Sequence, residues 1–270
     1  MADRAVVAEL EETWRSLLAL GGELDEADWD RATDCPGWTV RDQYSHVVGT
    51  ECSFLARGAR AGDEAFGPHV HNEIGQFNER EVRSRQGRSG AEILAELTEV
   101  SALRLEALRA MGDEDFTTDS WTPAGPGTYE GFMRIRVFDG WVHEQDVRRA
   151  VDRPGHLSGA AAERSLDQVV SATPFIVGKR AGAPDGATVT FSVTGPVDRT
   201  WAVGVEGRRA RPLDDVPESP TATLTTDFAT FMVLACGRRD PAAALEDGRV
   251  QVGGDASLGR AVATNLAFTI

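Results

Sequence analysis

Hydrophobic residues recur every three to four positions through much of the first half of the chain, which is the period of an amphipathic α-helix. Each end of this pattern carries a boundary signal. Gly21 follows the first helical stretch, Thr39 and Asp42 suit the start of the second, and Pro154 ends the last. The pattern predicts four long helices, which cover about residues 2–20, 39–51, 89–112 and 133–151.

The segments between these helices differ in length. Residues 58–90 are polar and partly helical at best, and residues 121–132 are rich in glycine and proline, which predicts a loop. Four long helices with unequal connections favour a four-helix bundle, a fold whose core commonly holds metal ions between facing helices.

The second half of the chain changes character. Short alternations of β-branched residues, separated by Gly, Pro and Asp, predict a small antiparallel sheet with strands at about 186–195, 200–207, 220–227 and 248–254. Helical patterns lie at about 160–177, 227–237 and 255–268. We therefore predict a helical bundle at residues 1–155 and a small α+β domain at residues 156–270.

The composition excludes several classes of protein. The net charge of −15 argues against nonspecific binding to nucleic acid or to acidic membranes. No apolar run reaches the roughly 18–20 residues that a membrane span needs, and the N-terminus lacks a signal-peptide pattern, so a cytoplasmic protein is expected. Cys35, Cys52 and Cys236 form no CxxC pair, which indicates neither a disulfide framework nor a thiolate zinc site.

Two of the predicted helices carry candidate metal ligands. Asp139 and His143 are four residues apart, so a helix places both on one face, and His46 lies on the second helix. If the two helices face each other, two imidazoles and one carboxylate surround a point with open coordination positions. The alternative is that each histidine is an ordinary core or surface residue, since the sequence does not show which helices face each other.

Neighbouring residues extend this hypothesis. Asp146 shares the face of His143 and is expected to orient an imidazole, the alternatives being direct ligation of the metal or a pair with an arginine. Glu144 points about 100° away and is expected to be an exposed charge, the alternative being a general acid or base. Trp38 and Trp141 flank the two motifs and either wall a pocket or pack in the core. The remaining candidates, His69 and His71, are expected in a solvated loop, the alternative being that they line the cleft.

Two segments identify a family resemblance. The sequence CPGWTVRDQYSHVVGTE, followed some ninety residues later by VFDGWVHEQDVRRAVDRPG, resembles the mycothiol-dependent maleylpyruvate isomerase family of actinobacteria. The resemblance implies a DinB-like bundle that binds a divalent metal, usually zinc, and a C-terminal domain similar to sterol-carrier proteins. It places the metal ligands at His46, Asp139 and His143. The characterised isomerases have glutamate where this chain has Asp139.

An open metal site of this kind suggests a reaction. Coordination to a divalent cation deprotonates a small thiol, which the resemblance implies to be mycothiol, and makes it a nucleophile. Addition to an electrophile such as maleylpyruvate permits isomerisation, and displacement of a leaving group gives S-transfer. Zinc is expected, although imidazole and carboxylate also suit iron and nickel. Arg80, Arg83 or Arg136 could contact an anionic substrate, or could instead be surface ion-pair partners.

Two other functions are compatible with the same residues. The C-terminal domain could hold a small apolar ligand in a binding protein without catalysis, or the metal and thiol could serve a resistance protein that sequesters electrophiles. The sequence does not indicate an oligomeric state.

Overall fold

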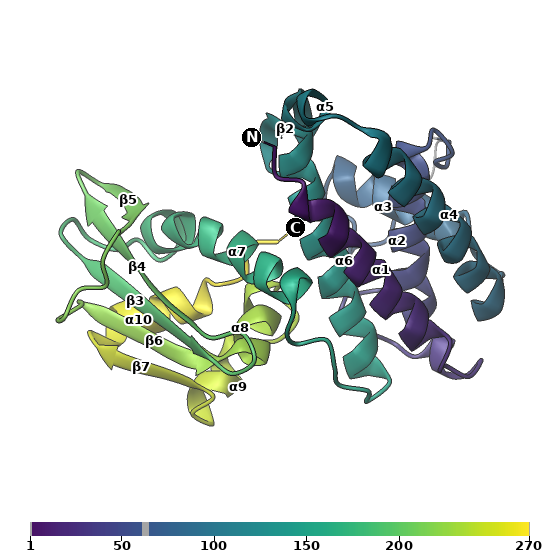
Figure 1. The fold of residues 1–270 in the computed structure, drawn as a ribbon. Helices are drawn as coiled ribbons and strands as arrows, with labels where there is room; N and C mark the ends of the chain where they lie inside the picture. The colour runs from purple at the N-terminus through teal and green to yellow at the C-terminus, as the bar shows by residue number, and fades with distance from the viewer. Residues whose placement is uncertain (1, 61–64, 270) are drawn as a thin grey trace. The chain divides into compact units, whose positions relative to one another are not determined.

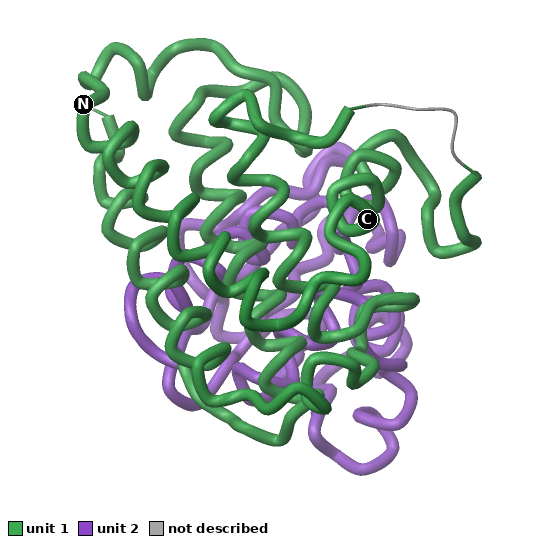
Figure 2. The backbone as a smooth tube through the Cα atoms, turned by 90° about the vertical axis from the view of Figure 1, so that its right-hand side faces the viewer, with its two compact units in different colours: residues 1–156, 270 green, residues 157–269 purple. Residues whose placement is uncertain are grey.

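Residues 2–60 and 65–269 are described by this computed structural model. The chain divides into two compact units, one ending at His156 and the other spanning Leu157–Thr269, which are coloured separately in Figure 2. Each unit has its own hydrophobic core and is described by itself. Within the described residues, no helix combines the length and the hydropathy needed to cross a membrane.

The first unit is a bundle of four long helices, as predicted (Figure 1). These helices are α1 (Ala5–Gly21), α2 (Val40–Phe54), α4 (Gly90–Ala110) and α6 (Tyr129–Ala150). Shorter elements fill the connections: a 3-10 turn (Asp28–Asp30), α3 (Glu73–Arg83), α5 (Asp113–Thr117), and strands β1 (Asp119–Thr122) and β2 (Gly125–Thr128).

The prediction of a loop over residues 121–132 is wrong. Strands β1 and β2 pair as an antiparallel hairpin there, and α6 begins at Tyr129, earlier than the hydrophobic pattern indicated. The side chain of Thr128 accepts a hydrogen bond from the backbone of Gly131 at 3.2 Å and so caps the helix. The hydrophobic pattern did not predict this first turn, because the start of the helix is set by the Thr128 cap and not by regularly spaced apolar residues.

The start of α2 agrees with the sequence. Thr39 and Asp42 form a capping box in which the carboxylate of Asp42 accepts from the backbone of Thr39 at 2.8 Å and the threonine side chain accepts in return. Helix α2 packs against both α4 and α6, and α1 packs against α4 and α6. The cap therefore sets where α2 begins opposite α6, and this position decides which side chains of the two helices meet.

The second unit begins with α7 (Ala160–Phe175), which continues into a π-helical turn at Ile176–Arg180. A five-stranded sheet follows, in the order β5-β4-β3-β6-β7. Its strands are β3 (Thr188–Thr194), β4 (Arg199–Glu206), β5 (Arg209–Pro212), β6 (Ala222–Asp227) and β7 (Val250–Gly254). Helices α8 (Phe228–Ala235), α9 (Pro241–Glu246) and α10 (Ala256–Thr264) complete the unit.

The sheet is mixed, so the prediction of an antiparallel sheet is wrong at one pair. Strand β6 runs parallel to β3, with Phe191 opposite Leu224, while the other neighbours are antiparallel. The cause is a crossover: after β5 the chain passes back over residues 213–221 to reach the free side of β3. The alternating pattern shows which side chains share a face, and it is the same for either strand direction.

Candidate metal centre

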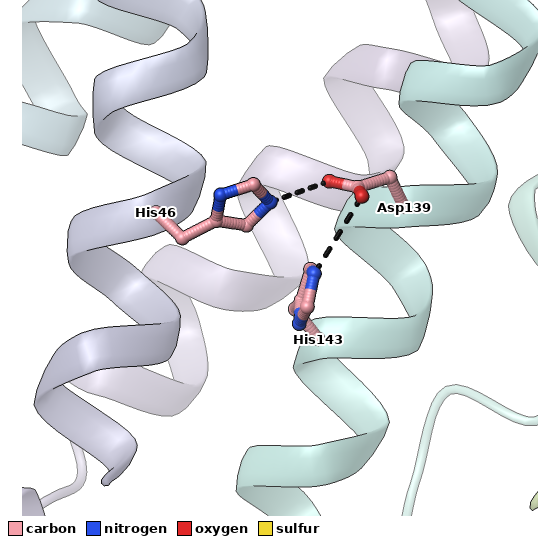
Figure 3. A group of neighbouring side chains, drawn as sticks. All are labelled: His46, Asp139 and His143. Carbon is pink, nitrogen blue, oxygen red and sulfur yellow. Dashed lines mark hydrogen bonds and ion pairs between the residues drawn. The ribbon is translucent and has the colours of Figure 1, made fainter. Parts of the chain in front are cut away.

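His46, Asp139 and His143 meet inside the bundle. His46 extends from the middle of α2, and the other two side chains lie one turn apart on α6 (Figure 3). His46 Nε2 is 3.0 Å from Asp139 Oδ2, and His143 Nε2 is 3.5 Å from Asp139 Oδ1. One donor atom from each residue lies within 4.8 Å of the others. The two helices do face each other, which the sequence could not show.

The spacing and the chemistry of these donors fit a metal ion. A tetrahedral zinc ion with bonds of 2.0–2.1 Å separates neighbouring donor atoms by about 3.3 Å. Two imidazoles and one carboxylate form a donor set that leaves further positions open for water or a substrate. Asp139 reaches both imidazoles, because it lies one turn from His143 on α6 and because α2, which carries His46, packs directly against α6.

His143 is held by a residue that the sequence analysis missed. Its Nδ1 donates to Oε1 of Gln43 at 2.5 Å, and the amide of Gln43 donates in turn to the Thr33 hydroxyl at 2.7 Å. This pair of bonds places the proton of His143 on Nδ1 and leaves Nε2 directed at Asp139. Gln43 precedes His46 by three residues and so shares its helix face. This spacing could have identified Gln43 from the sequence as a neighbour of the candidate ligands.

Asp146 has a lesser role at His143 than expected. One oxygen lies 3.6 Å from His143 Nδ1, which is beyond a normal hydrogen bond, and the other is paired with Arg149. The pair with Arg149 continues to Asp34, whose carboxylate accepts from that guanidinium at 2.8 Å. Asp146 therefore contributes negative charge close to the imidazole, while Gln43 supplies the direct contact.

A buried charge network supports Asp139 from the other side. Arg136 donates from Nη1 to Asp139 Oδ2 at 2.5 Å and from Nε to Glu51 at 3.0 Å. The second oxygen of Glu51 accepts from Arg104 at 2.9 Å. Glu51, Arg104 and Arg136 are all buried, so each charge depends on the others for compensation. The sequence analysis missed Glu51 and Arg104, because pairing across three helices leaves no local pattern.

The network sets the protonation of the candidate ligands. Burial opposes ionisation of Asp139, but Arg136 and the two imidazoles outweigh it and hold the pKa of Asp139 well below its usual range. Burial lowers the pKa of His46 to about 4, against the attraction of Asp139. Burial also opposes the charge on His143, yet Asp139 and Asp146 raise its pKa. At neutral pH, Asp139 and His46 are therefore already in the forms that bind metal ions.

Trp38 forms one wall of the centre. Its ring lies 5.1 Å from the His46 ring and 5.7 Å from the His143 ring, measured between centroids. Its indole N–H donates to Glu79 at 3.1 Å, and the same carboxylate also contacts His69. His69 thus belongs to the support of this wall. Both imidazoles are buried while the Asp139 side chain is 27% exposed, so of the three candidate ligands the carboxylate is the most accessible to solvent.

Trp141 and Glu144 lie elsewhere. The prediction that Glu144 is exposed is wrong: it is fully buried and accepts hydrogen bonds from Ser16 at 2.6 Å, Arg148 at 2.7 Å and the Nδ1 atom of His156 at 2.7 Å. The indole N–H of Trp141 donates to the backbone carbonyl of His156 at 2.8 Å. Both side chains face the returning chain behind α6, so neither lines the centre.

The two sets of polar residues occupy opposite faces of α6. At about 100° per residue, Glu144 and Arg148 lie roughly 140° from Asp139 and His143 respectively. The rear set also holds the chain that follows the helix, since Gln145 donates to the carbonyl of Gly155 at 3.1 Å and Arg148 donates to that of Arg153 at 3.2 Å. The helix that carries two candidate ligands is therefore fixed from behind by the segment leaving it.

Comparison with known proteins gives two matches to family models. The model described as the mycothiol maleylpyruvate isomerase N-terminal domain matches residues 10–148, and the one described as the MDMPI C-terminal domain matches residues 163–261. The first model alone covers more than half of the chain and includes all three candidate ligands. The comparison with curated protein sequences found no match.

Two solved structures of a mycothiol-dependent maleylpyruvate isomerase share the fold. The crystal structure of a mycothiol-dependent maleylpyruvate isomerase matches with a TM-score of 0.54 and 17% sequence identity, covering 87% of this chain and 89% of that one. A histidine-to-alanine mutant of this isomerase matches with a TM-score of 0.52 and 16% identity, over the same shares. Sterol Carrier Protein 2 Like 2 from Aedes aegypti covers 36% of this chain and 93% of its own, with a TM-score of 0.29 and 18% identity.

Replacing Glu51 by glutamine tests the buried charge network. We expect Glu51→Gln to lower the free energy of unfolding by about 3–5 kcal/mol, because it leaves Arg104 and Arg136 buried without their shared anion. Urea unfolding followed by circular dichroism measures this. Glu99→Gln is the matched control, since Glu99 forms an exposed pair with Arg57 and should change stability by at most about 1 kcal/mol. Equal effects of the two variants would contradict the network.

The rear face of α6 predicts a pH-dependent contribution to stability. Burial opposes the charge of His156, but Glu144 and Glu12 outweigh it and raise its pKa. Because the pKa of His156 is higher in the folded protein than the value of about 6.5 in the unfolded chain, the protonated imidazole stabilises the fold. This contribution is complete below the unfolded pKa and is lost as the pH rises through the folded pKa. The free energy of unfolding of His156→Asn should therefore be lower than that of the parent by more at about pH 6 than at about pH 9, which urea unfolding at the two pH values measures.

Asparagine is chosen because His156 has a φ of 53°, a backbone region that asparagine tolerates. His71→Asn, at an exposed histidine, serves as the control. A loss in stability that is the same at both pH values would show that His156 contributes packing alone.

Proposed function

The chain belongs to the mycothiol maleylpyruvate isomerase family, and we propose that it is a metal-dependent enzyme that activates mycothiol for attack on a small electrophile. The observation that carries the proposal is the convergence of His46, Asp139 and His143 from two facing helices. These residues would hold the metal, for which zinc is the proposed identity because its usual ligands include imidazole and carboxylate.

Each surrounding residue has a defined task in this proposal. Arg136 keeps Asp139 ionised and occupies one of its oxygens, which leaves the other oxygen directed at the centre. Gln43 holds the proton of His143 on Nδ1. Trp38 covers both imidazoles and excludes water from that side. A bound divalent metal would supply one thing, a lowered pKa of the thiol that enters the open position.

The charges of the centre favour anionic partners. Glu51 and Asp139 together balance Arg104 and Arg136, so the protein side chains of the network sum to about zero charge. A divalent cation added to this balanced set leaves a net positive centre, which attracts a thiolate and an anionic electrophile in an otherwise acidic protein. A substrate such as maleylpyruvate, which carries carboxylates, fits this requirement. Isomerisation and S-transfer begin with the same attack and differ in what leaves afterwards.

Metal content provides the first test of the proposal. Untagged protein purified without chelator should contain close to one equivalent of metal by inductively coupled plasma mass spectrometry. The double variant His46→Ala/His143→Ala should contain none, because it keeps one ligand of three. His71→Ala, which removes an exposed histidine, should retain the metal. Equal and negligible metal in parent and variants, even after incubation with zinc, iron or nickel, would remove the proposed mechanism.

Turnover separates the enzyme from a sequestering protein. With mycothiol and maleylpyruvate, the metal-loaded protein should form product over many cycles, and Asp139→Asn should reduce the rate to background because a neutral amide is a poor ligand. Chromatography of substrate, product and thiol measures this. Regenerated thiol indicates isomerisation, and consumed thiol indicates S-transfer. Thiol consumption that stops at one equivalent of protein would favour sequestration.

A further inference from the structure

An aromatic patch lies on the first unit, where α2 ends and α6 begins. Its outermost residue is Trp121 of strand β1, which is 61% exposed. The Trp121 ring meets the Phe132 ring edge to face, with 6.0 Å between their centroids, and the Phe132 ring lies 5.1 Å from that of Phe54. Phe54 and Phe132 are half-buried, so the patch presents apolar surface to solvent.

The patch stands on the same two helices as the candidate ligands. His46 of α2 contacts Asp139 of α6, and nearer the end of α2 Phe54 contacts Phe132, which is nearer the start of α6. The two helices are therefore antiparallel, and both rings lie on the same side of the ligands. Seven residues separate Phe132 from Asp139, which corresponds to about 10.5 Å along the helix axis.

A partly exposed stripe of α6 joins the patch to the centre. Phe132, Ile135 and Asp139 are spaced by three and four residues, so they share one face of the helix. All three are half-buried, whereas Arg136 and Val137 beside them are buried. The solvent-accessible part of this face therefore runs from the candidate ligand to the rings.

Neighbouring residues hold the rings of the patch in place. The guanidinium of Arg104 lies 4.5 Å from the centroid of the Phe54 ring and donates to the Tyr129 hydroxyl at 3.3 Å. The hairpin that carries Trp121 is closed by the Thr122 hydroxyl, which donates to a backbone carbonyl across the turn at 2.7 Å. Rings that are already ordered lose little conformational entropy when a ligand binds, which favours affinity.

Attachment of the hairpin to the helix explains only part of the patch. Strand β1 packs against α6, and the contact of Trp121 with Phe132 contributes to this packing. The larger part of Trp121 is left in water, where apolar surface is unfavourable. An exposed apolar patch that borders a candidate reactive centre is typical of a ligand-binding surface.

We propose that Trp121 and Phe132 bind the ring portion of the thiol cosubstrate, an inference that rests on the proposed function. Mycothiol carries its sulfur on a cysteine derivative that is linked to two polyhydroxylated rings, a glucosamine and an inositol. With the sulfur at the centre, the rings extend along the stripe toward the patch. The C–H faces of such rings pack on an indole by dispersion, and their hydroxyl groups stay in water because Trp121 is exposed. The patch thus selects thiols by the group attached to the sulfur.

Isothermal titration of the full chain with the glucosaminyl-inositol fragment, which lacks the thiol, tests this subsite without metal or turnover. We expect saturable binding, which Trp121→Ala should weaken about tenfold because the stacking surface is lost. Trp121→Phe should retain most of the affinity, since it keeps an aromatic ring. Phe175→Ala is the matched control, because it removes an exposed ring of the second unit. Absence of saturable binding, or equal loss in the control and in Trp121→Ala, would overturn the proposal.

Kinetics with two thiols provide a second readout. Trp121→Ala should lower the ratio of kcat/KM for mycothiol to kcat/KM for N-acetylcysteine, which lacks the rings, about tenfold. Equal losses with both thiols would indicate a structural role and overturn the subsite. If neither thiol supports turnover in the parent protein, the proposed function fails, while titration with the fragment still decides the subsite.

Sedimentation velocity distinguishes the subsite from a contact between copies of the chain. The parent and Trp121→Ala should sediment alike at every protein concentration, because the patch binds a small molecule. Self-association of the parent that Trp121→Ala abolishes, with fragment binding unchanged, would assign the patch to an interface and overturn the proposal.

Discussion

The bundle depends on charge compensation in its interior. Asp139 is an acceptor for Arg136 and lies against both imidazoles, and Arg136 is held by Glu51, which also binds Arg104. These residues tie α2, α4 and α6 together at one level of the bundle. Because buried charges are strongly destabilising when a partner is missing, none of the three helices can shift without exposing an uncompensated charge. The geometry of the candidate metal centre follows from this constraint.

The same network resolves the departure at Asp139. A carboxylate as short as that of aspartate still reaches two imidazoles here: the packing of α2 against α6 brings one oxygen to 3.0 Å from His46, and the one-turn spacing on α6 sets the other 3.5 Å from His143. Arg136 then removes the freedom that a short side chain would otherwise have. Aspartate at this position is therefore compatible with a three-ligand site, and its single free oxygen favours one bond to a metal over two.

Local signals predicted the long helices, the capping box at Thr39 and the shared face of Asp139 and His143, because all of these depend on residues within four positions of one another. Non-local contacts were out of reach. The parallel pairing of β3 with β6 depends on a crossover, and the Glu51–Arg104 pair spans two helices. The prediction that Glu144 is exposed was wrong for the same reason. Its side chain is buried by α1 and by the chain after α6, and a helical wheel of α6 gives no information about either segment.

Helix α6 is polar on two faces and yet largely buried. A helix of this kind is stable only where both faces find partners, since an unsatisfied buried polar group costs about 1–3 kcal/mol. The front partners are His46 and Glu51 of α2, which contact Asp139 and Arg136, and the rear partners are Ser16 and His156. Rotation of α6 that improved one set would break the other. The candidate ligands are thus positioned by residues on the far side of their own helix as well as by those that touch them.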